Sequence, residues 1–368
     1  MGKGGGEGRD VTRPLVTNAL SPSFCLLLAG TQLTWRKRVV EARGPLKIVV
    51  MGAGALGSIS AALLHEAGHE VSLVARGARA AHLQAHGVRV EGLADVTAAC
   101  PIVADPASLT EADLLIMTVK TFDTDAALQQ LAHVRFASCL SLQNGMMKDD
   151  QLAAVFGREA VLGAFANFSG AVREDGVALF TVNASITVGE LSGGVSPRAQ
   201  AVVDALNGAG INAHVSADIF SASWSKLIIW SGMAIVSTLT REPTVNIFSD
   251  PDTALLLARI HREVQTVAEA EGAVPQPVPP YSTAASLAVT DEAEMVRLAL
   301  ETGDFFRANA PLHKHSMLQD LERGKRLEVD ETLGDLVVRG RRLGVAVPAV
   351  DAGYRMIAGM DRIRRAAA

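Results

Sequence analysis

The stretch that decides the fold is LKIVVMGAGALGSISAALLHEAGH, residues 46–69. It opens with LKIVVM, an apolar run rich in β-branched residues, which is typical of a short buried strand. The glycine-rich turn GAGALG follows directly, and SISAALLHEAGH then has the amphipathic spacing of a helix. The stretch therefore predicts a strand, a tight turn and a helix in immediate succession.

The glycines of the turn have the spacing G-x-G-x-x-G. Gly52 permits the sharp turn, Gly54 lets a pyrophosphate approach the backbone, and Gly57 lets the helix pack close to the strand. The N-terminus of the helix offers free N–H groups and a positive dipole end to an anion. A purely structural turn would not explain this spacing between a strand and a helix. We therefore predict a dinucleotide site made by Gly52, Ala53, Gly54, Ala55, Leu56 and Gly57.

Further strands and helices alternate beyond this unit. EVSLVA (70–75), ADLLIMTVK (112–120) and SCLSLQNG (138–145) have the composition of buried strands, and TDAALQQLAHV, between the last two, has the spacing of a helix. Strands separated by helical segments predict a parallel, doubly wound sheet with helices on both faces. The expected fold class is α/β of the Rossmann type.

The end of the second strand indicates which dinucleotide binds. An acid about 20 residues beyond the turn suits the ribose of NAD, whereas arginine suits the 2′-phosphate of NADP. This strand ends in Ala75-Arg76, Arg79 follows one turn later, and no acid occurs before Glu91. The pattern favours NADP(H), with a solvated surface role for Arg76 as the alternative.

Two later strand ends carry polar side chains. Ligands in such sheets bind outside the carboxyl ends of the strands, and there the chain has Val119-Lys120 and Gln143-Asn144-Gly145. Lys120 is suited to a cofactor phosphate or ribose, and Asn144 to the nicotinamide or the substrate. Asn-Gly is also a common turn dipeptide, which leaves a structural role open for Asn144.

The second half of the chain changes character. Residues 160–215 still contain strand-like runs, among them VALFTV and ASITVGEL, whereas helical patterns follow from about residue 217. We expect a dinucleotide-binding domain over residues 46–216 and a helical domain over residues 217–368, with the substrate in the cleft between them. The helical candidates are TALLLARIHREVQTVAEAEG, EAEMVRLALETG, HSMLQDLERG and ETLGDLVVRGRRLG.

Few polar residues stand out in the helical half. In SASWSKLIIW (221–230), Lys226 lies between Trp224 and Trp230, and a buried ammonium costs several kcal/mol unless it finds partners or loses its proton. It either extends to water along its apolar stem or lies at the edge of a site. Ser316 and Asp320 share a helix face. Glu328 stands among apolar residues, although an acid at a helix start needs no function.

Composition narrows the classes of partner. The 368 residues carry a net charge of -5, which gives no electrostatic reason to expect nucleic acid or a membrane. Cys25, Cys100 and Cys139 lie far apart with no Cys/His cluster, so neither a disulfide framework nor a metal site is expected. A reducing, cytoplasmic location fits, with a small-molecule substrate and an oligomeric state that the sequence leaves open.

The N-terminal segment does not match the rest. FCLLLAG (24–30) is too short to span a bilayer, and no basic segment directly precedes it as in a signal peptide. We expect residues 1–45 to be a poorly ordered extension or the product of a misplaced start codon.

Several motifs together resemble one family. MGAGALGS (51–58), VKTF (119–122), LQNGM (142–146), WSKL (224–227) and SMLQDLERGKRLEVD (316–330) are similar to the ketopantoate reductases, the NADPH-dependent 2-dehydropantoate 2-reductases. LGVAVP follows the last and most specific of these motifs. The resemblance implies a Rossmann-type domain followed by a helical domain related to that of 6-phosphogluconate dehydrogenase.

The resemblance also implies roles for individual residues. Lys226 matches the catalytic lysine, which protonates or polarises the ketone as hydride arrives, and Glu328 matches the acid that orients the cofactor and this lysine. A cation at that position would stabilise the developing oxyanion. The remaining matches are to binding positions: Ser316 for substrate, Asn144 at the junction of cofactor and substrate, and Arg76 and Lys120 on the adenosine side of NADPH.

Three positions depart from the family pattern. Trp230 and Ala234 stand where pantoate-forming enzymes usually present asparagines, and His313 stands at a third such position. Losing those donors should change which substrate is accepted, with Trp230 in the substrate site. The expected activity is reduction of 2-dehydropantoate to pantoate, a step toward pantothenate and coenzyme A. The alternatives are the same chemistry on another 2-oxo acid or ketone, and a non-catalytic NADP(H)-binding sensor.

Overall fold

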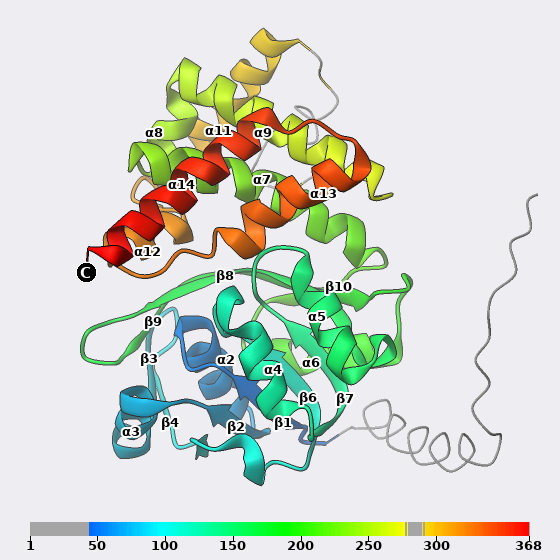
Figure 1. Cartoon of the computed structure of the whole chain (residues 1–368). Coiled ribbons are helices and arrows are strands. Elements are labelled where there is room, and N and C mark those ends of the chain that lie inside the picture. The colour runs from blue at the N-terminus through cyan, green and yellow to red at the C-terminus, as the bar shows by residue number, and fades with distance from the viewer. Residues whose placement is uncertain (1–43, 277, 279–288, 290, 368) are drawn as a thin grey trace, which may run out of the picture.

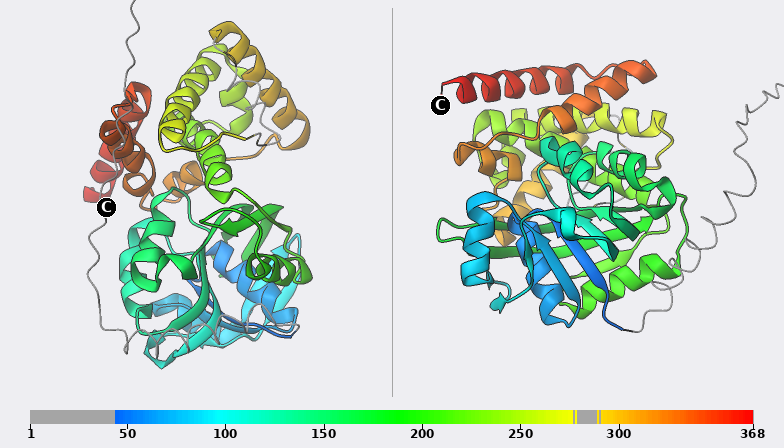
Figure 2. Two further views of the ribbon diagram at one scale, coloured as in Figure 1. Left: turned by 90° about the vertical axis from the view of Figure 1, so that its right-hand side faces the viewer. Right: turned by 60° about the horizontal axis from the view of Figure 1, so that its bottom comes forward.

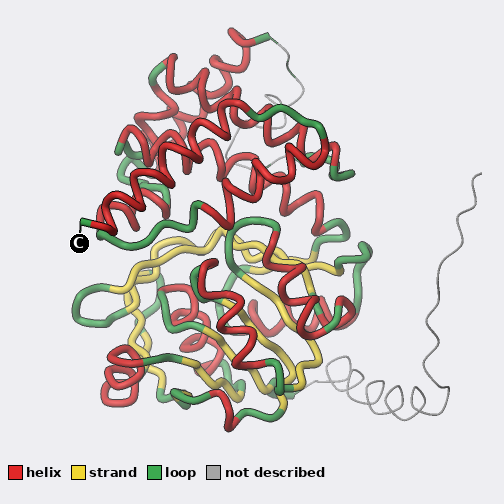
Figure 3. Tube along the Cα trace, in the orientation of Figure 1, coloured by secondary structure: helices red, strands yellow, loops and turns green. Residues whose placement is uncertain are grey.

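The protein divides into a half that contains the strands and a half built of helices (Figure 1, Figure 3). The computed structural model describes residues 44–276, 278, 289 and 291–367. The expected N-terminal extension lies outside the described residues, apart from residues 44 and 45. Figure 2 shows the same two halves from two further sides.

A five-stranded parallel sheet forms the base of the first half. Its order is β5-β2-β1-β6-β7, and every neighbouring pair is parallel. The chain crosses from β1 to β2 through helix α2, as the opening stretch predicts, and the Rossmann-type fold is confirmed. The strands are β1 (Lys47–Met51), β2 (Glu70–Val74), β5 (Ile102–Val103), β6 (Glu111–Met117) and β7 (Arg135–Ser141).

A second sheet lies beside the first. Its long strand β9 pairs antiparallel with β8 along one edge and parallel with β3 and β10 along the other, while β4 pairs with β3. A bridge between Cys139 and Val161 links the start of β8 to β7. The strands are β3 (Val88–Gly92), β4 (Val96–Ala98), β8 (Leu162–Val172), β9 (Ala178–Glu190) and β10 (Ala213–Val215).

Strand β9 corrects one expectation. The runs VALFTV and ASITVGEL, expected as separate strands, form one continuous strand through Asn183. The pairing with β8 shifts register twice, between Asn167 and Phe168 and between Ser169 and Gly170, which accommodates the irregularity. The Asn183 amide bonds the backbone of Gly210 and Asn212, so a residue that usually ends strands is satisfied inside one.

Helices cover the two faces of the parallel sheet unequally. On one face, α4 and α5 pack over a core that includes Val49, Leu115 and Leu131. On the other face lies α2, with the second sheet beyond it, so helices lie on both faces as expected. The helices of this half are α2 (Ala55–Glu66), α3 (Gly77–His86), α4 (Thr124–Leu131), α5 (Met147–Phe156) and α6 (Pro197–Gly208).

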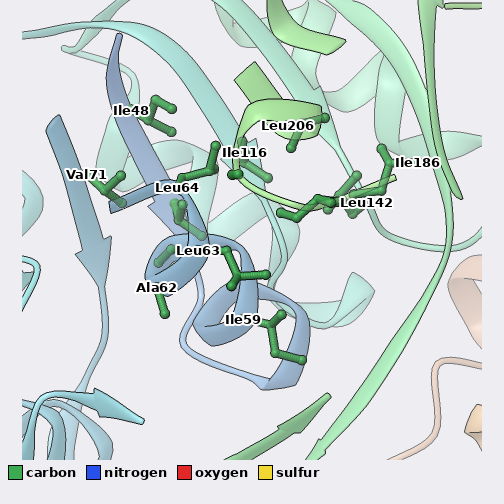
Figure 4. Packing of buried hydrophobic residues seen from close by; sticks show 14 of the residues in the cluster. Ile48, Ile59, Ala62, Leu63, Leu64, Val71, Ile116, Leu142, Ile186 and Leu206 are labelled. Atoms are coloured by element: carbon green, nitrogen blue, oxygen red, sulfur yellow. The ribbon is translucent and has the colours of Figure 1, made fainter. Parts of the chain in front are cut away.

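Helix α2 is buried between the two sheets. The sequence predicts an amphipathic helix, but every residue from Gly57 to Leu64 is buried. Ile59 and Leu63 belong to the same apolar cluster as Ile48 of the first sheet and Ile186 of the second (Figure 4). The prediction of an amphipathic helix was wrong, because the helix has a sheet on each side and its serines are small enough to be buried together with its apolar residues.

The second half is entirely helical among its described residues. Its central helix α7 packs against α8, α9, α12 and α14. By length and composition α7 is apolar enough to cross a membrane, but 83% of its most hydrophobic window is buried inside the protein. The helices are α7 (Ile219–Thr240), α8 (Thr244–Ser249), α9 (Pro251–Ala270), α11 (Glu292–Asn309), α12 (Ser316–Glu322), a π-helical turn (Asp330–Gly334), α13 (Asp335–Leu343) and α14 (Pro348–Ala366).

Candidate active site

A cavity of about 840 Å³ lies where the two halves meet. The glycine turn and the loops after β2, β6 and β7 line it from one side, and α7, α11 and α12 line it from the other. Every residue that the sequence nominates for cofactor or substrate lines this cavity, with the exception of Gly57. The carboxyl ends of the strands therefore face the helical half, as expected for this sheet type.

The glycine turn fits a phosphate group. Gly52 has a φ of 112°, and a Cβ there would lie 2.8 Å from the nitrogen of Val119. A Cβ on Gly57 would lie 1.9 Å from the carbonyl oxygen of Gly52, so α2 passes too close to the turn for any side chain. A Cβ on Gly54 would meet nothing within 4 Å. Space is thus open in front of the first turn of α2, which has no side-chain cap and no acid.

The two arginines after β2 do different things. Arg79 donates to the carbonyl oxygens of Ala53 (3.1 Å) and Gly176 (2.7 Å) and to Ser58 Oγ (3.0 Å), so it braces the glycine turn. Burial lowers the pKa of this guanidinium. Arg76 is exposed and, among the described residues, pairs only loosely with Asp123, with 3.9 Å between Nη2 and Oδ2. Arg76 therefore remains available to an anionic group at the cavity edge.

Lys120 joins the two halves of the molecule. Its Nζ donates to Asp320 Oδ2 at 2.6 Å and to Glu328 Oε2 at 2.8 Å, and Glu328 Oε1 accepts the backbone N–H of Thr121 at 2.8 Å. Burial alone would lower the pKa of Lys120, but the charges of Glu328 and Asp320 outweigh it and raise the pKa. Glu328 thus lies in the cavity wall with both carboxylate oxygens occupied.

Lys226 projects from α7 toward the other half. Its Nζ donates to Asn144 Oδ1 at 2.7 Å, and no carboxylate of a described residue accepts from it. Burial, and after it the charge of Lys148, lowers the pKa of Lys226 to about 8, with Glu328 acting in the opposite direction. Lys148 is itself buried and paired with Asp149 at 2.7 Å. The arrangement gives an ammonium that can lose its proton near neutral pH.

The substrate side of the cavity combines one hydroxyl with aromatic rings. Ser316 lines it at the start of α12, and Trp230 lines it from α7. Trp230 packs edge-on against His315, with 5.1 Å between ring centroids. His313 also lines the cavity, where its Nδ1 lies 2.7 Å from Thr244 Oγ1. Ala234, one of the departures from the family pattern, is fully buried and does not reach the cavity, whereas Met233 does.

Three contributions escaped the sequence reasoning. Asp320 had been noted only as sharing a face with Ser316, and its pairing with Lys120 spans 200 residues of the chain. The bracing by Arg79 depends on the carbonyl of Gly176, which a sequence does not position. Met233 was also missed, and the only signal for it was the apolar run IIWSGM, which places Met233 on one helix face with Lys226 and Trp230.

The fold and the cavity define the class as an oxidoreductase with a dinucleotide-binding domain. Two family models match the chain: ketopantoate reductase PanE/ApbA over residues 48–193, and ketopantoate reductase PanE/ApbA C terminal over residues 218–361. The chain belongs to the ketopantoate reductase family, and the resemblance drawn from its motifs is confirmed.

Known proteins agree with this assignment. The 2-dehydropantoate 2-reductase of Archaeoglobus fulgidus is 30% identical over 299 residues, which cover 81% of this chain and 92% of the relative. The solved PanE/ApbA family ketopantoate reductase from Ralstonia eutropha JMP134 is 26% identical, with a TM-score of 0.72 over 87% of this chain and 99% of that one. A D-mandelate dehydrogenase, solved with NADH and anilino(oxo)acetate, shares the fold at 23% identity and a TM-score of 0.75, covering 87% of this chain and 99% of that chain.

Proposed function

We propose that the protein reduces the ketone of a 2-oxo acid to a 2-hydroxy acid with NADPH, and that 2-dehydropantoate, giving pantoate, is the reference substrate. The observation that carries the proposal is Lys226, which lines the cavity and whose Nζ is held by Asn144 at 2.7 Å. The names of the relatives supply the reference substrate. The reaction would be a step toward pantothenate and coenzyme A, in a cytoplasmic enzyme.

The chemistry needs one cation and one proton. A nicotinamide dinucleotide, when bound, would supply the hydride to the carbonyl carbon. Lys226 hydrogen-bonds the carbonyl oxygen, stabilises the negative charge that develops there and transfers a proton to it, which leaves a neutral amine that water reprotonates. A pKa lowered to about 8 keeps the ammonium mostly protonated at neutral pH and makes the proton easier to give up.

The acidic residues have a positioning role in this proposal. Glu328 is held by Lys120 and by the backbone of Thr121, so its carboxylate is fixed before any cofactor binds. It lies close enough to Lys226 to favour the protonated ammonium. Ser316 is proposed to bind the substrate carboxylate, and Asn144 to hold Lys226 beside the nicotinamide.

The preference for NADPH over NADH rests on Arg76. Its guanidinium is exposed beside the cavity and lies no closer than 3.9 Å to an acid with which it pairs among the described residues, which suits a 2′-phosphate. Replacing Arg76 with Ala should weaken NADPH binding and leave NADH binding nearly unchanged. Equal effects on the two cofactors would overturn the NADPH assignment.

A second candidate is the same reaction on another 2-oxo acid or ketone. It is favoured by Trp230, an indole in the cavity wall where pantoate-forming enzymes usually have asparagine. A site that no longer presents that amide should select substrates differently.

One assay separates these candidates from a non-catalytic sensor. NADPH oxidation is followed with 2-dehydropantoate and with a panel of other 2-oxo acids, with NADH as the cofactor control. Reduction of a 2-oxo acid that is lost in Lys226→Ala supports the proposal. Tight NADPH binding without turnover of any ketone would favour the sensor instead, and near-normal kcat in Lys226→Ala would remove the role of that lysine.

A further inference from the structure

One face of α7 carries the cavity-lining residues in a regular series. Lys226, Ile229, Trp230 and Met233 all line the cavity, and their spacing of three, four and seven residues places them on one side of a helix. From Lys226 to Met233 the helix rises by about 10 Å. An apolar strip, made of Ile229, Trp230 and Met233, therefore leads away from the ammonium.

Apolar side chains from a second helix, α11, also line the cavity. Phe305 and Phe306 of α11 line it, together with Val278 and Ala310. Phe306 packs against Phe248 with ring centroids 6.3 Å apart and against His313 at 5.3 Å, so its ring is held in place. A ligand group that reaches both these residues and the apolar strip would contact hydrocarbon from two elements of the fold.

His315 keeps the strip uncharged. Its Nδ1 accepts the backbone N–H of Met317 at 3.3 Å, so in the neutral ring the proton is on Nε2. Burial, followed by the charges of His313 and Lys226, lowers the pKa of His315 to about 3, which keeps the ring neutral at physiological pH. The imidazole thus supports the Trp230 indole at 5.1 Å without placing a charge beside it.

We propose that this site selects 2-oxo acids whose side chain is aryl or branched alkyl, and that Trp230 and Met233 determine this specificity. The inference rests on the proposed function, because the keto group must lie at Lys226 for the side chain to reach the apolar strip. Apart from the indole N–H of Trp230, the strip offers no hydrogen-bonding group. Against the strip, the side-chain hydroxyl of 2-dehydropantoate would lose water and find few partners, namely the indole N–H and the nearby ring of His313, whereas an apolar side chain gains buried area.

The test compares kcat/KM for phenylpyruvate and 4-methyl-2-oxopentanoate with kcat/KM for 2-dehydropantoate. The wild type should prefer the two apolar acids by about tenfold or more, which is the scale on which apolar pockets discriminate. Trp230→Asn, which introduces an amide, should reverse or abolish the preference. Trp230→Phe, which keeps the ring and removes only the N–H, should retain it.

Trp224→Phe is the matched control. Trp224 lies on the same helix and is fully buried, but it does not line the cavity. This variant should lose some stability and keep the substrate ratio of the wild type. A change in that ratio as large as the one in Trp230→Asn would show that helix packing, and not the apolar strip, sets the specificity.

A binding measurement distinguishes failure of this inference from failure of the proposed function. Oxamate and N-phenyloxamate, which resemble 2-oxo acids but are not reduced, are titrated into the protein with NADPH, and bound nicotinamide fluorescence is followed. N-phenyloxamate should bind about tenfold or more tightly than oxamate, because it buries a ring. Turnover that favours 2-dehydropantoate, or equal binding of the two oxamates, would overturn the inference alone. Absence of turnover with every 2-oxo acid would overturn the proposed function.

Discussion

Replacing Asn144 with Asp tests whether Lys226 is the proton donor. Because the active lysine must carry its proton, kcat/KM should be constant below the pKa of about 8 and fall tenfold for each pH unit above it. The substitution places a carboxylate oxygen where the Asn144 oxygen now lies, 2.7 Å from Nζ. A negative charge at that distance stabilises the ammonium and must raise its pKa.

The size of the shift follows from the geometry. At 2.7 Å and an effective dielectric constant of about 20, the Coulomb attraction is about 6 kcal/mol. Part of it is offset by the cost of burying the new carboxylate. Opposite charges at such distances raise the pKa of a cation by about 1 to 3 units, so the alkaline limb should move from about 8 to between about 9 and 11.

The assay is the pH profile of kcat/KM for NADPH oxidation at saturating cofactor. A new negative charge in the cavity will also weaken cofactor binding. The readout is therefore the pH at which kcat/KM begins to fall, and not the absolute value of kcat/KM. Asn144→Ser, which removes the amide without adding charge, is the control and should not move the limb upward. If the Asp variant is active and its limb stays at the wild-type pH, Lys226 is not the group that titrates.

Two further predictions concern the glycine turn and the link between the halves. Gly54→Ala should fold normally and lose more than about tenfold in NADPH affinity, about 1.4 kcal/mol, because its Cβ would fill the space in front of α2. Gly57→Ala should instead lower the free energy of unfolding by about 1–3 kcal/mol or more, because its Cβ collides with backbone. Calorimetric titration and urea unfolding measure the two effects, and a stable Gly57→Ala would contradict the packing argument. Glu328→Gln should destabilise the protein by about 1–2 kcal/mol in urea unfolding, because Lys120 loses one of two anionic partners. Asp320→Asn should cost less, because its remaining amide oxygen can still accept from Lys120, whereas Gln at position 328 has one oxygen for the two donors Lys120 and Thr121. An equal loss in the two variants would contradict this argument.

Local patterns in the sequence were enough to predict most of the fold. Two kinds of signal identify the strand–turn–helix unit at residues 46–69 and the later buried runs: the spacing of their apolar residues and the residue types of their turns. The structure has strands and helices at these places. The second sheet was not predictable in the same way. Its order depends on β9 pairing with β3, and strands β5, β6 and β7 of the parallel sheet lie between these two in the sequence. Local periodicity carries no information on such contacts.

The candidate site, like the fold, was predictable where local motifs mark it and not where distant segments meet. Residues fixed by motif and strand end, such as Lys120, Asn144 and Lys226, do line one cavity. Contacts that need the two halves to dock were missed, as the bond from Asp320 to Lys120 illustrates. The sequence suggested that Ala234 would face the substrate, but the helix turns Met233 to the cavity instead. A match to the family pattern therefore identifies which turn of a helix lines the site, but it identifies less securely which side chain of that turn points into the site.

The burial of α2 between two sheets has a consequence for protein engineering. Altering cofactor preference by transplanting a strand–turn–helix unit assumes that the unit is a self-contained cassette. Here, residues 46–69 moved alone would leave Ile59 and Leu63 without the hairpin of β8 and β9 that covers them. The smallest exchangeable module that keeps the phosphate site rigid is therefore the strand-containing half as a whole, and chimaeras with relatives should be joined just before α7.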